Sequence, residues 1–193
     1  MQAAVFLDRD GVLIEDVDRL LSPDRLSVLP GAAEALARLG GAGFALVLVT
    51  NQPVVARGLC TLDDIDRIHD ELDHRLRAAG GPALDARYVC PHHPDADDSA
   101  YRVSCDCRKP RPGMLVRAAR ELRLDLERSY MVGDRPSDVA AGAAAGCTTV
   151  QVRSGRHDAP PIVSPEPFDP TLEPVATVPD LTAAADWILS RPS

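Results

Sequence analysis

The chain has 193 residues and a formal net charge of −8, from 29 acidic and 21 basic residues. Hydrophobic residues make up 45% and charged residues 26%, a composition that excludes a wholly disordered or fibrous protein. The length predicts a single domain over residues 1–193, and the acidic charge disfavours nucleic-acid and anionic-membrane partners.

Strand-like and helix-like apolar patterns alternate along the chain. In chain order we expect strand 3–7, helix 32–39, strand 44–49, helix 62–79, strand 86–89, helix 113–122, strand 130–132, helix 136–145, strand 148–152 and a closing helix at about 180–190. This alternation predicts an α/β fold, a Rossmann-like parallel sheet with helices on both faces. The polar, cysteine-rich segment 90–112 and the Pro-rich segment 153–179 do not fit the alternation, and we expect the second to be an irregular tail, wrapped on the surface or partly mobile.

Polar groups follow successive predicted strands. Asp8-Arg9-Asp10-Gly11 comes after the first strand and Thr50-Asn51-Gln52 after the second, and further along stand Arg108-Lys109 and Gly133-Asp134 with Asp138. The carboxyl ends of parallel strands share one edge of a sheet, where ligands bind. Alone, an Asp-x-Asp pair is most simply a solvated turn. Carboxylates, a hydroxyl and a lysine together are what phosphoryl transfer requires, with a divalent cation to offset like-charge repulsion.

These residues resemble the four motifs of the haloacid dehalogenase (HAD) superfamily of aspartate-nucleophile phosphatases: Asp8-x-Asp10-Gly11, Thr50, Lys109 and Gly133-Asp134-x-x-x-Asp138. The resemblance implies that Asp8 is the nucleophile and Asp10 the general acid and base. It also implies that Mg²⁺ is held by Asp8, the Asp10 carbonyl and Asp134, with Asp138 orienting these ligands. Thr50 and Lys109 are then expected to steady the phosphoryl group.

Three of the five cysteines cluster with histidines in Cys90-Pro91-His92-His93 and Cys105-Asp106-Cys107. Because cytosolic proteins rarely rely on disulfides, a Cys₃His set predicts structural zinc, which would close loop 90–107 and fix Arg108-Lys109. Free surface thiols are the simpler alternative. From spacing alone, His93 can replace His92 as the fourth ligand. Cys60 and Cys147 stand alone and are expected to be buried hydrophobes.

One sequence run narrows the resemblance from the superfamily to a subgroup of it: Cys105-Asp106-Cys107-Arg108-Lys109-Pro110. With the preceding C-x-H it looks like the D-glycero-D-manno-heptose 1,7-bisphosphate 7-phosphatases, and it is similar to the histidinol-phosphate phosphatases that share their core. The resemblance implies that His92 rather than His93 binds zinc. It implies substrate contacts for Arg108 and for Arg135, which stands where the family commonly has a lysine.

Other candidate contacts lie in two loops. Asn51 and Gln52 follow Thr50 and are expected to bind substrate. Val17-Asp18-Arg19 replaces a segment that in the family often reads His-Gly-Tyr, so Asp18 and Arg19 are either substrate contacts or, as we favour, solvated loop charges.

The motif spacing predicts an open site. Only 39 residues separate Asp10 from Thr50 and 58 separate Thr50 from Lys109, which leaves no room for a cap domain. An open site admits macromolecules, and the Thr-Asn-Gln motif also resembles nucleic-acid 3′-phosphatases, but the net charge disfavours such a substrate. A small phosphosugar held by Arg108 and either Arg19 or Arg57 fits better.

Two alternatives to a heptose-bisphosphatase remain. A histidinol-phosphate phosphatase would need an acidic wall for the ammonium group, from Asp16, Asp18 or the acidic residues of segment 95–98. A catalytically silent phosphosugar-binding protein is disfavoured because binding alone does not need both Asp8 and Asp10. The longest purely apolar run, 44–49, is too short to span a bilayer, and no basic start precedes Asp8, so we expect a soluble, cytoplasmic protein. We also expect it to be a monomer.

Overall fold

Six parallel strands form one sheet in the computed structural model, which describes residues 1–17, 19–156, 169 and 171–191. The strand order is β3-β2-β1-β4-β5-β6. The strands are β1 (Ala4–Leu7), β2 (Ala45–Asn51), β3 (Ala86–Cys90), β4 (Tyr130–Gly133), β5 (Thr148–Val152) and β6 (Ala176–Val178). Every pairing is parallel, and β1 lies in the middle between β2 and β4. This topology brings all the strand ends that carry the motifs to one edge.

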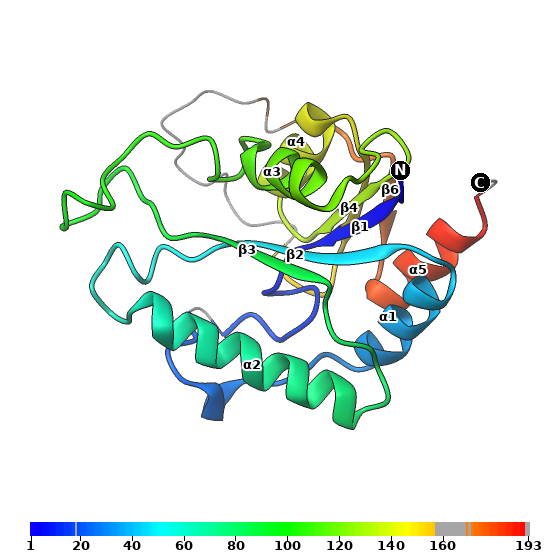
Figure 1. Ribbon diagram of the computed structural model, residues 1–193, viewed down its shortest axis with the longest axis horizontal. Helices are drawn as coiled ribbons and strands as arrows, with labels where there is room; N and C mark the ends of the chain where they lie inside the picture. Colours follow the sequence, from blue (N-terminus) through cyan, green and yellow to red (C-terminus); the bar gives the residue numbers. More distant parts are fainter. Residues whose placement is uncertain (18, 157–168, 170, 192–193) are drawn as a thin grey trace.

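Helices cover both faces of the sheet (Figure 1). Helices α1 (Ala32–Gly41), α2 (Leu62–Ala78) and α5 (Leu181–Leu189) pack on one face, and α3 (Gly113–Leu122) and α4 (Pro136–Ala145) on the other. Side chains of β1 alternate accordingly: Val5 and Leu7 join the first core, and Ala4 and Phe6 join the second. The predicted α/β fold is therefore confirmed.

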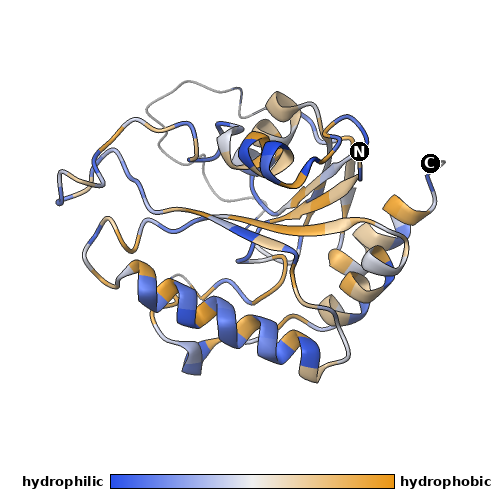
Figure 2. Cartoon of the chain, viewed as in Figure 1, coloured by the Kyte–Doolittle hydropathy of each residue, from blue (hydrophilic) through white to orange (hydrophobic). Residues whose placement is uncertain are grey.

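Helix α2 shows how the sequence sets its own boundaries. It begins at a capping box, in which the Thr61 hydroxyl accepts a hydrogen bond from Asp64 N and the Asp64 carboxylate accepts one from Thr61 N. Its buried residues recur every three or four positions, and Figure 2 shows the resulting hydrophobic and hydrophilic faces of the helix. This face carries Ile65, Ile68, Leu72 and Leu76, and also His69.

The structure differs from the predicted elements mainly after β5. Strand β6 lies inside the segment 153–179 that was expected to be irregular, and it pairs with the free edge of β5. The abundant prolines hid this three-residue strand in the sequence pattern. Residues 157–168 and 170 of the segment lie outside the described residues. Helix α1 also continues through Gly40 and Gly41 instead of stopping before them, and a short 3₁₀ helix, η1 (Pro23–Arg25), precedes it.

No cap domain is inserted in the part of the chain that the structure describes. Between β1 and β2 lie only η1, α1 and loops, and between β2 and β3 lies only α2 with its loops. None of the described helices combines the length and the apolar character needed to cross a lipid bilayer.

Candidate active site

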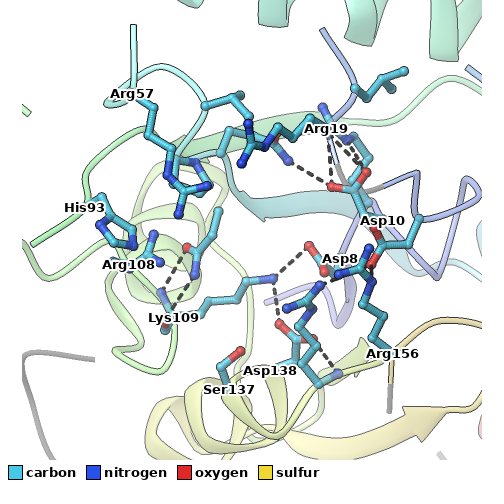
Figure 3. A pocket seen from close by; sticks show the side chains of 18 residues that line it. Asp8, Asp10, Arg19, Arg57, His93, Arg108, Lys109, Ser137, Asp138 and Arg156 are labelled. Carbon is cyan, nitrogen blue, oxygen red and sulfur yellow. Dashed lines mark hydrogen bonds and ion pairs between the residues drawn. The ribbon is translucent and has the colours of Figure 1, made fainter. Parts of the chain in front are cut away.

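A polar cavity of about 250 Å³ lies at the carboxyl edge of the sheet, where the loops after the strands meet (Figure 3). Its lining is rich in arginine although the whole chain is acidic, with seven basic and four acidic residues. Most of the predicted site residues line it: Asp8, Asp10, Arg19, Asn51, Gln52, Arg108, Lys109, Arg135 and Asp138. The predicted contact Asp18 lies outside the described residues.

Lys109 links the first and last motifs. Its buried ammonium group lies 2.9 Å from Asp8 Oδ1 and 2.7 Å from Asp138 Oδ1, and it donates to the carbonyl of Val49 at 2.8 Å. These contacts use all three donors of the group. Burial opposes the charge, but the Asp138 and Asp8 carboxylates outweigh it and raise the pKa of Lys109. The lysine therefore holds a positive charge directly beside the candidate nucleophile.

Asp8, Asp134 and Asp138 form a buried carboxylate cluster, in which one oxygen from each residue lies within 4.8 Å of the other two. The Oδ1 atom of Asp134 is buried with no hydrogen-bond partner among the described residues. Burial first, and then the charges of Asp138 and Asp8, raise the pKa of Asp134 to about 8. An unpartnered carboxylate oxygen among other carboxylates fits a site for a hard divalent cation. The Asp10 side chain is not part of this cluster.

Two glycines allow the loops to close over Asp134. A Cβ atom on Gly11 would lie 2.7 Å from both Asp134 Oδ2 and the Cα of Gly155, and Gly11 adopts a φ of +77°. The loop after β5 then supplies Arg156 N, which donates to Asp134 Oδ2 at 2.6 Å. The backbone of both loops therefore fixes the orientation of this carboxylate.

Asp10 is held from two sides. Arg9, which is only 1% exposed, donates from Nη2 to both Asp10 carboxylate oxygens, at 3.1 and 3.0 Å. Gln52 Nε2 donates to Asp10 Oδ2 at 3.0 Å and to Thr50 Oγ1 at 2.9 Å. The amide of Gln52 thus ties the carboxylate of the first motif to the hydroxyl of the second.

Asn51 contacts the catalytic region through the backbone. Its Nδ2 atom donates to the Lys109 carbonyl at 2.9 Å, and its Oδ1 atom accepts from Lys109 N at 3.1 Å. This pair of hydrogen bonds fixes the loop that carries Lys109 to the end of β2. The side chain predicted to bind substrate is used here to position the lysine.

Arg57, His93 and Arg108 lie together on the side of the cavity away from Asp8 and Asp10 (Figure 3). Arg108 is 6% exposed and donates to the carbonyl of His92 at 2.9 Å, while its Nε atom has no partner among the described residues. Burial lowers the pKa of His93, and the charges of Arg108 and Arg57 lower it further. This wall is therefore cationic and has a free donor.

A third group of charges lies beside the Asp134 loop. Arg135 Nη2 donates to Asp16 Oδ2 at 3.1 Å, and Arg156 Nε lies 2.9 Å from the same oxygen. Two guanidinium groups therefore offset the negative charge of Asp16. Asp16 is not available as the acidic wall that would bind the ammonium group of histidinol phosphate. The acidic run 95–98 does not line the cavity.

The cysteine cluster lies next to Arg108 in the chain. His92 Nδ1 is 3.7 Å from Cys90 Sγ and 3.4 Å from Cys107 Sγ, and Cys105 Sγ is 3.7 Å from Cys90 Sγ and 3.2 Å from Cys107 Sγ. A tetrahedral zinc site with Zn–S bonds of about 2.3 Å needs ligand atoms about 3.8 Å apart. The four groups are close to that arrangement, whereas His93 faces the cavity. Hydrogen bonding from Cys90 lowers the pKa of Cys107 to about 5.

Several lining residues were not predicted from the sequence. Arg9 lies between Asp8 and Asp10, and the sequence motif assigns roles to the two aspartates but none to the arginine. Arg156 follows β5, in the segment that was expected to be an irregular tail. The position of Arg156 did carry a signal, because it comes just after a strand like the other motifs. Ser137 and His93 also line the cavity.

The chain is similar in sequence to known phosphatases of one family. Residues 106–184 match the HAD-hydrolase-like family. A D-glycero-beta-D-manno-heptose-1,7-bisphosphate 7-phosphatase from Yersinia pestis is 40% identical over 188 residues, which cover 97% of this chain and 89% of the relative. The enzyme of that name from Photorhabdus laumondii is 45% identical over 154 residues, covering 79% and 81% of the two chains.

Structural similarity extends over the same length. A crystal structure of a D,D-heptose 1,7-bisphosphate phosphatase from B. bronchiseptica, complexed with magnesium and phosphate, matches with a TM-score of 0.79 and 37% identity. The match covers 97% of this chain and 98% of that one. The HAD fold, the carboxylate cluster and this degree of identity lead to one conclusion: the chain belongs to the family of D-glycero-beta-D-manno-heptose-1,7-bisphosphate 7-phosphatases, which are HAD-type phosphatases.

Proposed function

We propose that the protein removes the 7-phosphate of D-glycero-D-manno-heptose 1,7-bisphosphate in a Mg²⁺-dependent reaction. The observation that carries this proposal is the pairing of two sites in one cavity. Asp8, Lys109 and the carboxylate cluster lie on one side, and the cationic wall of Arg57 and Arg108 lies on the other. A bisphosphate needs both, because each of its ends carries a dianion. The names of the relatives support this choice of sugar.

The first step transfers the phosphoryl group to the protein. An Asp8 carboxylate oxygen attacks phosphorus, and the bond between phosphorus and the sugar oxygen breaks. Asp10 donates its proton to the departing oxygen, which leaves as a hydroxyl group. Lys109, already beside Asp8, offsets the negative charge of the phosphoryl oxygens, and Thr50 offers its hydroxyl to one of them.

The second step returns Asp8 to its free form. Asp10, now a carboxylate, takes a proton from a water molecule whose oxygen attacks phosphorus and displaces Asp8. Inorganic phosphate leaves, and Asp10 is protonated again. Asp8, Asp134 and the carbonyl of Asp10 would hold Mg²⁺, which would supply positive charge to offset the repulsion between the carboxylates and the phosphate. Asp138 contributes by holding Lys109 rather than as a direct ligand.

The cationic wall of Arg57 and Arg108 discriminates between the candidate substrates. Arg57 and Arg108 suit the second phosphate of a bisphosphate, with the free Arg108 Nε as an available donor. The ammonium group of histidinol phosphate would face these same guanidinium groups and be repelled. A catalytically silent binding protein is also disfavoured, because Arg9 and Gln52 are both used to orient Asp10.

We further propose that Cys90, His92, Cys105 and Cys107 hold a structural zinc ion. None of the five cysteines forms a disulfide, so the thiols of the cluster are available as ligands. The cluster adjoins Arg108 and Lys109, so its closure fixes one substrate contact and the catalytic lysine together. Every group of the proposed site comes from one chain, so a monomer suffices.

A phosphate-release panel tests this function. Purified protein with Mg²⁺ is given both anomers of heptose 1,7-bisphosphate, histidinol phosphate and a 3′-phosphorylated oligonucleotide, each beside the matched variant Asp8→Asn. We expect kcat/KM for the preferred heptose anomer to exceed that for histidinol phosphate by at least about 100-fold, since losing a charge-assisted contact costs about 1.5–3 kcal/mol and two are involved. Equal or higher turnover of histidinol phosphate would refute the substrate assignment, and full activity of Asp8→Asn would refute the nucleophile.

A further inference from the structure

The inner face of helix α2 carries a buried histidine behind the active site. His69 is 1% exposed and does not line the cavity, so it has no direct access to substrate. Its Nε2 atom lies 3.4 Å from Nη1 of Arg9, the residue whose other nitrogen atoms hold Asp10. We propose that His69 is a positioning residue, which fixes the Arg9 guanidinium so that Arg9 can orient the Asp10 carboxylate for proton transfer. This inference rests on the proposed function of Asp10.

Arg9 connects the two side chains as a rigid plane. Its Nη2 donates to both Asp10 oxygens and its Nε lies 3.3 Å from Asp10 Oδ1, so this edge of the guanidinium faces the carboxylate. Nη1 points away from Asp10 toward His69. Because the guanidinium is planar, an acceptor at Nη1 sets the rotation of the edge that holds Asp10.

The chemistry of the pair determines the tautomer of His69. Arginine has only donors, so Nε2 is the acceptor in this pair and the proton of the neutral ring is on Nδ1, which is buried with no hydrogen-bond partner among the described residues. Burial, and then the charges of Arg9 and Arg87, lower the pKa of His69 to about 3. The ring is therefore neutral under working conditions and keeps its Nε2 lone pair for Arg9.

A neutral acceptor is the residue type that this position requires. A carboxylate at position 69 would compete with Asp10 for the charge of Arg9 and draw the guanidinium toward α2. An apolar side chain would leave Nη1 as a buried donor without a partner, and the guanidinium would rotate to find one. Histidine satisfies Nη1 and leaves the ionic attraction directed at Asp10.

The test compares two esters that differ in their need for a general acid. The heptose bisphosphate has an alkoxide leaving group that must be protonated, whereas p-nitrophenyl phosphate releases a phenolate that needs little protonation. The measured quantity is kcat/KM, which reports the first transfer step. For His69→Leu we expect a fall of at least about 10-fold on the sugar phosphate, part of the 10²–10⁴-fold that a general acid supplies, and less than about 2-fold on p-nitrophenyl phosphate. His69→Gln, which keeps an acceptor near Nε2, should recover most of the loss.

Asp10→Asn separates failure of this inference from failure of the proposed function. If Asp10→Asn shows the same ester-selective loss and His69→Leu lowers both esters equally or neither, His69 has no positioning role and the function stands. If Asp10→Asn lowers both esters equally, the general-acid assignment itself is wrong, and the inference falls with it.

The tautomer gives a second test on the unaltered protein, independent of whether the variants fold. Nitrogen chemical shifts of ¹⁵N-histidine-labelled protein distinguish a protonated ring nitrogen from an unprotonated one. For His69 we expect an unprotonated Nε2 and a protonated Nδ1. The signals of His69 are identified because they are missing from the spectrum of His69→Gln. If that variant does not fold, they are identified because the buried ring is protected from exchange with solvent. A proton on Nε2 would exclude the hydrogen bond from Arg9 and overturn the inference.

Discussion

Acid should destabilise this protein through His69 by an amount that can be measured against His69→Gln. The pKa of His69 is lowered to about 3 in the folded protein, by burial first and then by Arg9 and Arg87, with only Asp70 acting in the opposite direction. In the unfolded chain the pKa of a histidine is about 6.5. Below that pH the unfolded state binds the extra proton, so the stability contributed by the neutral, buried ring is full above pH 6.5 and is lost as the pH falls toward 3.

The size of the loss follows from the slope of about 1.4 kcal/mol per pH unit. Between pH 7 and pH 5 the free energy of unfolding of the wild-type protein should fall by about 2 kcal/mol more than that of His69→Gln. Urea unfolding at the two pH values measures both, and His74→Gln is the matched control, because His74 is exposed on the same helix. If wild type and His69→Gln lose the same stability within about 0.5 kcal/mol, His69 is not held neutral beside Arg9.

Three further predictions concern the active site and the cysteine cluster. Lys109→Met should lower the free energy of unfolding by about 3–5 kcal/mol, because it leaves the buried Asp8 and Asp138 carboxylates uncompensated; urea unfolding measures this, and a loss under 1 kcal/mol would contradict it. Gly155→Ala should weaken Mg²⁺ activation by at least about 10-fold in a magnesium titration, since its Cβ would overlap the Asp134 carboxylate; unchanged activation would show that the loop adapts freely. Cys105→Ser should lower the zinc content below one ion per chain in elemental analysis and increase proteolysis of loop 90–107, whereas zinc-free wild-type protein would exclude the zinc proposal.

The parallel α/β fold was predictable because its signals are local. Helix α2, for instance, is marked by the capping residues Thr61 and Asp64 and by apolar residues at helical spacing, and its observed bounds differ from the predicted ones by one residue. Strand β6 was missed because a three-residue strand has too few positions to show alternation, and its pairing depends on the free edge of β5, which no local pattern reveals.

The site was predictable where residues have one chemical use and unpredictable where they have several. Asp8 and Lys109 were assigned from motif order, and the structure places their charged groups 2.9 Å apart. Asn51 has two hydrogen-bonding faces, and only the structure shows that both are used by the Lys109 backbone. Arg9 and His69 are 60 residues apart in sequence, so their contact depends on how α2 packs against the sheet.

No cap domain covers the site among the described residues, so the rigidity of the site requires another source. In this chain, contacts around the cavity supply it: Asn51 fixes the Lys109 backbone, His69 lies against Arg9, and the cysteine cluster directly precedes Arg108. Each arrangement fixes a residue that lines the cavity through a group on a neighbouring strand, helix or loop. Catalytic geometry here therefore depends in part on residues that do not line the cavity, such as His69, and substitution of His69 should change kcat more than KM.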